Sequence, residues 1–140
     1  MVLYLDTSVL VKLYVEEEGS PEFKAIVTSS RVAATSLISY AEARAAFARR
    51  FREKAFTPRE YRRLTDSFEE DWGNYLRIRA SEGLVKRAGN LAERHGLRGL
   101  DAIHLASALL LAEELSSAVL FASSDQKLQE ASRRERLAQP

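Results

Sequence analysis

The chain opens with Met1-Val2-Leu3-Tyr4-Leu5-Asp6-Thr7-Ser8, an apolar run that stops at a carboxylate followed by two hydroxyls. A short apolar run of this kind is typical of a strand that is buried on both faces of a parallel sheet. In open α/β sheets, binding and catalytic groups collect at the carboxyl ends of the strands. Asp6 therefore occupies a position where a catalytic or metal-binding carboxylate is expected.

Further along the chain, segments with strand character alternate with segments that carry helix-capping signals. We expect strands at residues 1–5, 31–35, 75–80 and 118–122. We expect helices at residues 8–14, 21–29, 36–54, 58–72, 82–95, 100–115 and 126–134, the first capped by Thr7 or Ser8 and the second by Ser20. This alternation predicts an α/β fold, a three-layer α/β/α sandwich around a parallel sheet of four to five strands. Residues 1–140 are expected to form one domain, with a frayed polar tail at residues 133–140.

Composition excludes several classes of protein. The chain contains no Cys, so it has no disulfide and no thiolate metal site. Its apolar stretches are too short and too interrupted to span a bilayer. The first strand begins at residue 1, which leaves no room for a signal peptide. We therefore expect a cytoplasmic protein without a membrane partner.

Asp125 repeats the placement of Asp6, because it lies just past the strand expected at residues 118–122. A plainer role for Asp125 is to cap the helix that follows it. The same plain alternative applies to Asp6, since an acid after a strand commonly begins a turn.

Two more acids lie on expected helices. Asp101 begins the apolar segment 100–115, on which it forms one narrow polar stripe with His104 and Ser107. A helix that is apolar nearly all round is buried, so a polar stripe on it needs partners, and we count His104 among the supporting residues of a site. Glu42 has no basic residue one turn away on its own helix, so it is expected to face a cleft or to meet a cation.

These four acids come from two strand ends and from two helices that would flank those strands. Such positions can converge on one edge of a right-handed parallel sheet. Four neighbouring carboxylates repel one another, and a divalent cation relieves that repulsion. Ligation by oxygen alone favours Mg²⁺ or Mn²⁺ over zinc.

Four stretches of the chain resemble, in order and spacing, the acidic motifs of the PIN domain, and most closely those of VapC-type toxins. They are Leu3-Tyr4-Leu5-Asp6-Thr7-Ser8, Ser39-Tyr40-Ala41-Glu42, Asp101-Ala102-Ile103-His104-Leu105-Ala106 and Ser123-Ser124-Asp125. The resemblance implies a magnesium-dependent ribonuclease in which Asp6, Glu42, Asp101 and Asp125 form the catalytic and metal-binding quartet. Thr7 or Ser8, with Ser123, would supply supporting hydroxyls, although the family often has Thr at the position of Ser123. The resemblance also implies a homodimer that is silenced by a cognate antitoxin.

Basic residues gather between positions 44 and 63, although the net charge of the chain is only +1. An acidic site repels RNA, so basic side chains must supply contacts to phosphates. The candidates are Arg44, Arg49, Arg50 and Arg52. The plainer interpretation of such a run is a solvated helix face.

Three other functions are compatible with parts of this pattern. A haloacid-dehalogenase-like phosphotransferase requires a second Asp two residues after the first, where this chain has Ser8. A receiver-like phosphoacceptor domain requires paired acids after the first strand, and here Thr7 follows Asp6. A PIN-like module that binds RNA or protein without cleaving it stays open, although the presence of all four acids argues against an inactive site.

Overall fold

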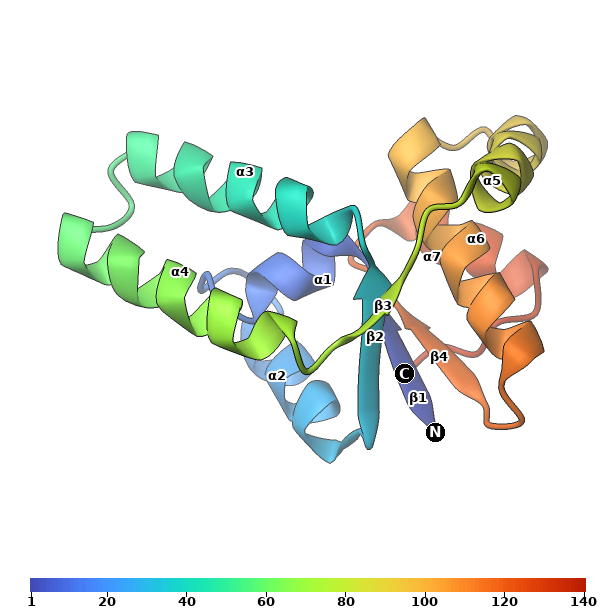
Figure 1. Cartoon of the computed structure of the whole chain (residues 1–140), viewed down its shortest axis with the longest axis horizontal. Helices are drawn as coiled ribbons and strands as arrows, with labels where there is room; N and C mark the ends of the chain where they lie inside the picture. Colours follow the sequence, from blue (N-terminus) through green and yellow to red (C-terminus); the bar gives the residue numbers. More distant parts are fainter.

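Four strands form one parallel sheet in the computed structural model, which describes residues 1–140. The strands are β1 (Val2–Leu5), β2 (Val32–Ser36), β3 (Leu76–Ile78) and β4 (Val119–Ala122). Their order is β3-β2-β1-β4, so β1 lies inside the sheet and all of its residues are buried (Figure 1). In the β1–β4 register Leu5 pairs with Ala122. The residues that follow these two strands therefore emerge side by side at the carboxyl edge of the sheet.

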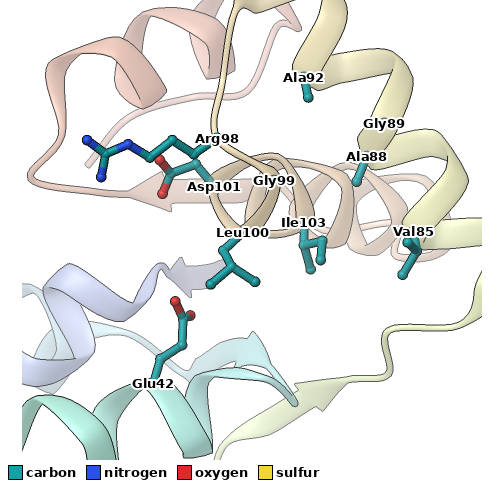
Figure 2. A pocket seen from close by; sticks show the side chains of 10 residues that line it. All are labelled: Glu42, Val85, Ala88, Gly89, Ala92, Arg98, Gly99, Leu100, Asp101 and Ile103. Carbon is teal, nitrogen blue, oxygen red and sulfur yellow. The ribbon is translucent and has the colours of Figure 1, made fainter.

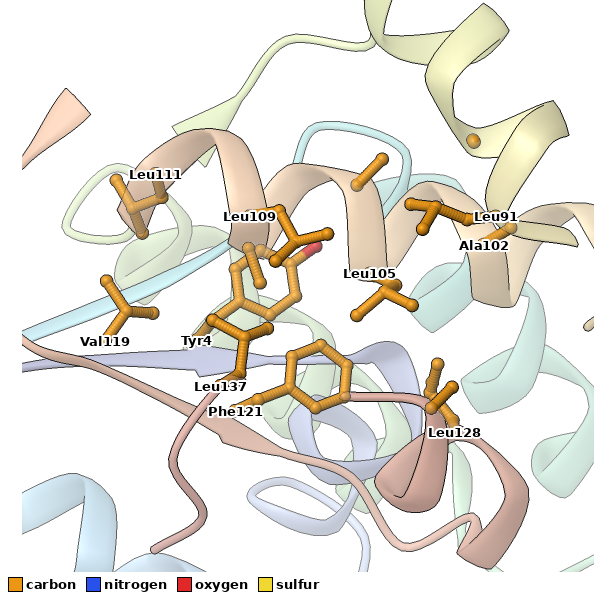
Figure 3. Packing of buried hydrophobic residues seen from close by; sticks show 14 of the residues in the cluster. Tyr4, Leu91, Ala102, Leu105, Leu109, Leu111, Val119, Phe121, Leu128 and Leu137 are labelled. Atoms are coloured by element: carbon orange, nitrogen blue, oxygen red, sulfur yellow. The ribbon is translucent and has the colours of Figure 1, made fainter. Parts of the chain in front are cut away.

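Seven helices cover the two faces of this sheet. They are α1 (Thr7–Lys12), α2 (Ser20–Ser29), α3 (Ser39–Arg52), α4 (Pro58–Trp72), α5 (Glu82–His95), α6 (Gly99–Glu114) and α7 (Gln126–Arg134). Successive side chains of a strand point to opposite faces. Val2 and Tyr4 accordingly belong to a core with α5, α6 and α7 (Figure 3), and Leu3 and Leu5 to a second core with helices α1 to α4. The predicted three-layer α/β/α sandwich is confirmed, with four strands.

Helices α3 and α4 run side by side and extend away from the sheet (Figure 1). Between them Phe47 and Phe68 are fully buried and meet edge to face, with ring centroids 5.2 Å apart. Nearer the far end of the pair Phe51 stacks on Tyr61 with centroids 4.3 Å apart. Such aromatic pairs add stability beyond the area that they bury. These contacts fix the position of α3, which carries Glu42.

The start of α2 differs from the expected cap. Ser20 is the first residue of the helix, and the preceding Gly19 is its N-cap. Gly19 has φ +88°, a left-handed conformation that glycine adopts without steric cost. The Ser20 hydroxyl instead donates to the carbonyl of Val15, which ties the helix to the first part of the loop that follows α1.

The expected fraying of residues 133–140 is wrong, because this tail is docked. Leu137 is 7% exposed and belongs to the same core as Tyr4. The amide of Phe121 donates to the carbonyl of Ala138 at 2.8 Å, so the tail covers the outer edge of β4. The buried Leu137 side chain and the backbone contact of Ala138 together hold the tail on the sheet.

None of the seven helices is both long enough and apolar enough to cross a bilayer.

Candidate active site

Asp6 follows β1 and caps α1, so neither Thr7 nor Ser8 is the cap. Its side chain is buried, and Oδ1 accepts hydrogen bonds from the Ser8 hydroxyl at 2.6 Å and from the Val9 amide at 3.0 Å. Oδ2 accepts a hydrogen bond from the Ser123 hydroxyl at 2.6 Å. Donors on both oxygens hold a buried carboxylate in one orientation.

Ser123 connects the ends of β1 and β4. Besides donating to Asp6, its hydroxyl oxygen accepts a hydrogen bond from the Asp125 amide at 3.0 Å. Asp125 caps α7, because its Oδ1 accepts from the Leu128 amide at 2.9 Å. The plainer role considered for Asp125 is therefore real. Capping α7 does not exclude Asp125 from the acidic cluster, because the Asp125 carboxylate also raises the pKa of Asp101.

Asp101 lies in the first turn of α6 and makes no side-chain hydrogen bond or ion pair. Burial raises the pKa of Asp101, and the nearby carboxylates of Asp125 and Asp6 raise it further, while His104 and Arg98 act in the opposite direction. The three acids are thus close enough to repel one another. They come from the ends of β1 and β4 and from α6, as the sequence predicted.

Glu42 lies in the first turn of α3, and its carboxylate is held by residues of two other elements. Oε1 accepts hydrogen bonds from the Thr7 hydroxyl at 2.5 Å and from His104 Nε2 at 3.1 Å. Burial alone raises the pKa of Glu42, but the hydrogen bonds from His104 and Thr7 outweigh it, and the net pKa is lowered. Glu42 is therefore an ionised carboxylate at neutral pH.

His104 is 2% exposed, and a second buried group fixes its ring. The Tyr4 hydroxyl lies 2.9 Å from Nδ1. Burial raises the pKa of Tyr4 well above its ordinary value, so the hydroxyl keeps its proton and can donate to Nδ1. In the tautomer that this network implies, Nε2 carries a proton that it can donate to Glu42 Oε1 at 3.1 Å and to the Thr7 hydroxyl oxygen at 3.0 Å. Of the polar stripe on α6, His104 and Ser107 thus have hydrogen-bond partners, and Asp101 has none.

A pocket of about 590 Å³ brings Glu42 and Asp101 to one cavity, between α3 and the α5–α6 pair. Figure 2 shows Glu42 facing the N-terminal turn of α6, with the Leu100 side chain pointing toward it. The Arg98 and Asp101 side chains lie next to each other on the other side of that turn. The pocket therefore has acids at one end and an apolar wall that includes Leu100 and Val85.

The four predicted acids do not form one tight cluster. The carboxylates of Asp125 and Asp6 raise the pKa of Asp101, whereas Glu42 is turned to His104 and Thr7. No group of three His, Asp or Glu side chains is already arranged around a single ion position. The donor set nevertheless fits a hard divalent cation in its chemistry, because it is made of carboxylate oxygens with an unpaired, repelled member in Asp101.

Two residues of the site were not singled out from the sequence. The sequence predicts Tyr4 only as part of an apolar strand, because the partner of its hydroxyl lies 100 positions away. Arg98 precedes Asp101 by three residues, which is the spacing of neighbours on a helix face. That spacing was the available signal for Arg98.

The arginines predicted to bind RNA fall into two groups. Those of the first group, Arg44 and Arg50, form ion pairs with acids of the same chain. Arg44 Nη1 donates to Glu69 at 3.0 Å, and Arg50 Nη1 donates to Glu17 at 3.0 Å. These ion pairs tie α3 to α4 and to the loop before α2. Arg44 and Arg50 are therefore poorly placed to contact RNA.

The second group consists of Arg49 and Arg52, which are exposed. The guanidinium of Arg49 approaches Glu53 only at 4.0 Å, and Arg52 forms no ion pair. Both line a depression of about 460 Å³ on the surface of α3 together with Glu42. They stay candidates for phosphate contacts.

Comparisons with known proteins agree with this arrangement. Residues 3–134 match the family model of the PIN domain. Ribonuclease VapC45 of Mycobacterium tuberculosis is 35% identical over 112 residues, which cover 80% of this chain and 78% of the relative. A chain of the FitAcB crystal structure from Neisseria gonorrhoeae superposes with a TM-score of 0.66 at 19% identity, covering 99% of this chain and 95% of that one. A chain of a toxin–antitoxin complex from Klebsiella pneumoniae has a TM-score of 0.61 at 19% identity and covers 89% and 88%.

Proposed function

Because the chain belongs to the PIN-domain family and is of the VapC type, we propose that it is an endoribonuclease and the toxin of a toxin–antitoxin pair. One observation supports this proposal above the others. Asp6 and Asp125 follow β1 and β4 at the carboxyl edge of the sheet and are joined through Ser123, and Asp101 lies in the first turn of α6. Acids in this arrangement are suited to hydrolysis of a phosphodiester bond with the help of a divalent cation.

We propose Mg²⁺ as the cofactor, with Mn²⁺ as an alternative that the same oxygen ligands would accept. Asp6 and Asp101 would hold the ion directly or through water, and Glu42 and Asp125 would complete its surroundings. When bound, such an ion lowers the pKa of a coordinated water and neutralises charge on the scissile phosphate.

The protein's own side chains prepare the site for this chemistry. Ser8 and Ser123 orient the Asp6 carboxylate through one hydrogen bond to each of its oxygens. Thr7 and His104 hold the Glu42 carboxylate ionised at the wall of the pocket. Carboxylates held in this way can accept hydrogen bonds from an attacking water and so direct it toward the phosphorus atom.

The proposed partners follow from the same family membership. The similar Klebsiella pneumoniae chain belongs to a toxin–antitoxin complex, and we propose that this chain likewise pairs with a cognate antitoxin. Its homodimerisation and its cytoplasmic location stay predictions.

Mapping of RNA ends tests the proposed function. The purified chain is incubated with a mixture of structured and unstructured RNAs in the presence of Mg²⁺, Mn²⁺ or a chelator. We expect new ends with either metal and none with the chelator. Asp101→Asn should abolish cleavage, whereas Asp66→Asn, which removes an exposed acid on α4, should leave it unchanged. Equal cleavage by wild type and Asp101→Asn would exclude Asp101 from the catalytic set.

A further inference from the structure

Helix α4 carries a stripe of exposed charge on the side opposite its buried residues. Arg59, Arg63, Asp66 and Glu70 follow one another at spacings of four, three and four residues, which places them on one face of the helix. We call these four residues the α4 stripe. All of them are exposed, and the stripe is basic toward the start of the helix and acidic toward its end.

The order of charges along the α4 stripe is unfavourable within a single copy of the chain. A helix carries partial positive charge at its N-terminus and partial negative charge at its C-terminus, so the stripe opposes the helix dipole. Arg59 lies one turn before Arg63, and Asp66 lies one turn before Glu70, so these close neighbours repel each other. A stripe that only faced water would be more stable with alternating signs.

Other helices of the chain have the favourable order of charges. On α3 and α5 an acid lies in the first turn and basic residues lie in the last turn. Helix α4 has no basic residue in its last turn, and the acid in its first turn, Glu60, is engaged in the capping box with Thr57. The arrangement on α4 is therefore not a general feature of this protein's surface.

The charges of the α4 stripe have no partners within the chain. Several exposed charges on other helices do have partners, since Arg87 pairs with Glu113 at 2.6 Å and Arg134 pairs with Glu130 at 2.8 Å. The residues of the α4 stripe take part in none of the ion pairs of the structure. Both halves of the stripe are thus available to an external partner.

The α4 stripe is complementary to itself when a second copy of the helix lies antiparallel to it. With the midpoint of the stripe as the centre, Arg59 of one copy faces Glu70 of the other, and Arg63 faces Asp66. The facing charges lie about 8 Å and about 2 Å from this centre along the helix axis. A two-fold axis makes each of these pairs twice, as an isologous contact requires.

The position of α4 leaves the stripe accessible. Helices α3 and α4 extend away from the sheet, and the stripe lies on the outer side of this pair (Figure 1). Helix α3 separates α4 from the pocket that contains Glu42 and Asp101. A second copy seated along α4 therefore leaves the acidic sites of both copies open.

We propose that two copies of this chain associate through the α4 stripe in an antiparallel, two-fold contact. This inference goes beyond the proposed ribonuclease function and does not rest on it. The contact is charged and contains no large apolar side chain, so it belongs to the small, weak class of interfaces. Because exposed ion pairs are individually weak and are screened by salt, the association is favoured at low ionic strength.

Charge reversal tests this contact. Sedimentation velocity at rising protein concentration gives the mass of each chain at low and at high salt. Arg59→Glu/Arg63→Glu makes the stripe wholly acidic, and Asp66→Arg/Glu70→Arg makes it wholly basic. The combination of all four substitutions restores a self-complementary stripe with the order of charges reversed. Every variant reduces the opposition to the helix dipole, so folding is retained, and circular dichroism verifies it.

The wild type at low salt should reach at least twice the mass that it has at high salt. Each double variant alone should associate about tenfold more weakly or less, because attractive pairs become repulsive. A mixture of the two double variants should regain the association, and so should the combined variant by itself. Arg31→Glu/Arg133→Glu is the matched control, since it changes the net charge as much as Arg59→Glu/Arg63→Glu does, and it should associate as the wild type does.

Three outcomes would overturn the contact. The first is a wild-type mass that does not depend on salt. The second is equal association of all variants, because another face of the chain would then hold the copies together. The third is a combined variant that stays apart, because a stripe that binds a different partner would not be restored by exchanging its charges.

Discussion

Replacing Tyr4 by Phe tests the hydrogen-bond network that holds Glu42. The Tyr4 ring is fully buried and stacks on Phe121 with centroids 5.6 Å apart, and these contacts survive the change. What the variant loses is the hydroxyl that lies 2.9 Å from His104 Nδ1. The substitution therefore removes a hydrogen bond while leaving packing nearly intact.

The expected cost follows from the burial of both partners. His104 is 2% exposed, so its Nδ1 would be left without a partner and without access to water. Leaving one buried polar atom unpaired costs about 1–3 kcal/mol. For a chain of this length, that loss corresponds to a fall in melting temperature of about 3–10 °C. Because Nδ1 no longer accepts a hydrogen bond from Tyr4, the tautomer that points Nε2–H at Glu42 should also be less dominant.

Two measurements check this reasoning. Thermal unfolding with chelator gives the stability difference, and long-range proton–nitrogen NMR of the His104 ring gives its tautomer. Tyr61→Phe is the matched control, since the Tyr61 hydroxyl makes no hydrogen bond while its ring stacks on Phe51. A Tyr4→Phe chain that melts with the wild type and keeps the same tautomer would refute the network.

Three other outcomes are expected. Asp101→Asn should melt at a higher temperature than the wild type in chelator, because burial and the carboxylates of Asp125 and Asp6 raise the pKa of Asp101, and its ionised form therefore opposes folding above that pKa. Added Mg²⁺ should stabilise the wild type alone. A lower melting temperature for the variant in chelator would contradict this. The pKa of Glu42 is lowered, so its carboxylate contributes stability at pH values above its ordinary pKa of 4.5, and this contribution is lost as the pH falls further. The free energies of unfolding of wild type and Glu42→Gln, from denaturant titrations, should therefore differ by about 1–2 kcal/mol at pH 7 and converge in acid. A difference that persists in acid would argue that the charge of Glu42 is not its cause. Deleting residues 137–140 should lower the free energy of unfolding by about 2 kcal/mol, because it removes the buried Leu137 side chain and exposes the core residues that it covers. Deleting the last residue alone should be silent, and equal stability of both truncations would show that the tail is not docked.

The strands and the acids that follow them were predictable because short-range patterns determine them. The apolar runs before Asp6 and Asp125 could only be buried strands in an alternating chain, and the carboxyl ends of parallel strands lie at one edge. Asp101 was found through the polar stripe on an otherwise apolar helix. In each case the signal was contained in a segment of fewer than twenty residues.

The remaining features depend on contacts between distant residues. Glu42 meets His104 across 62 positions and Tyr4 meets His104 across 100, and no local pattern encodes either contact. The tail was expected to fray because its composition is polar, but Leu137 finds a place in a core built by other elements. The arginines of α3 look alike in sequence, and only their ion-pair partners on other elements distinguish them.

The position of β1 has a consequence for how the chain tolerates change. Because helices cover both sides of the sheet, this strand has no solvent-facing position at which a substitution would go unnoticed. Inserting or deleting a single residue would turn the side chains of the strand to the opposite faces of the sheet. It would thereby move Asp6 and the Tyr4 hydroxyl away from their partners at the same time. In a saturation library, most substitutions within Val2–Leu5 should therefore cost folding and cleavage together, with Tyr4→Phe as the exception because it keeps the buried ring.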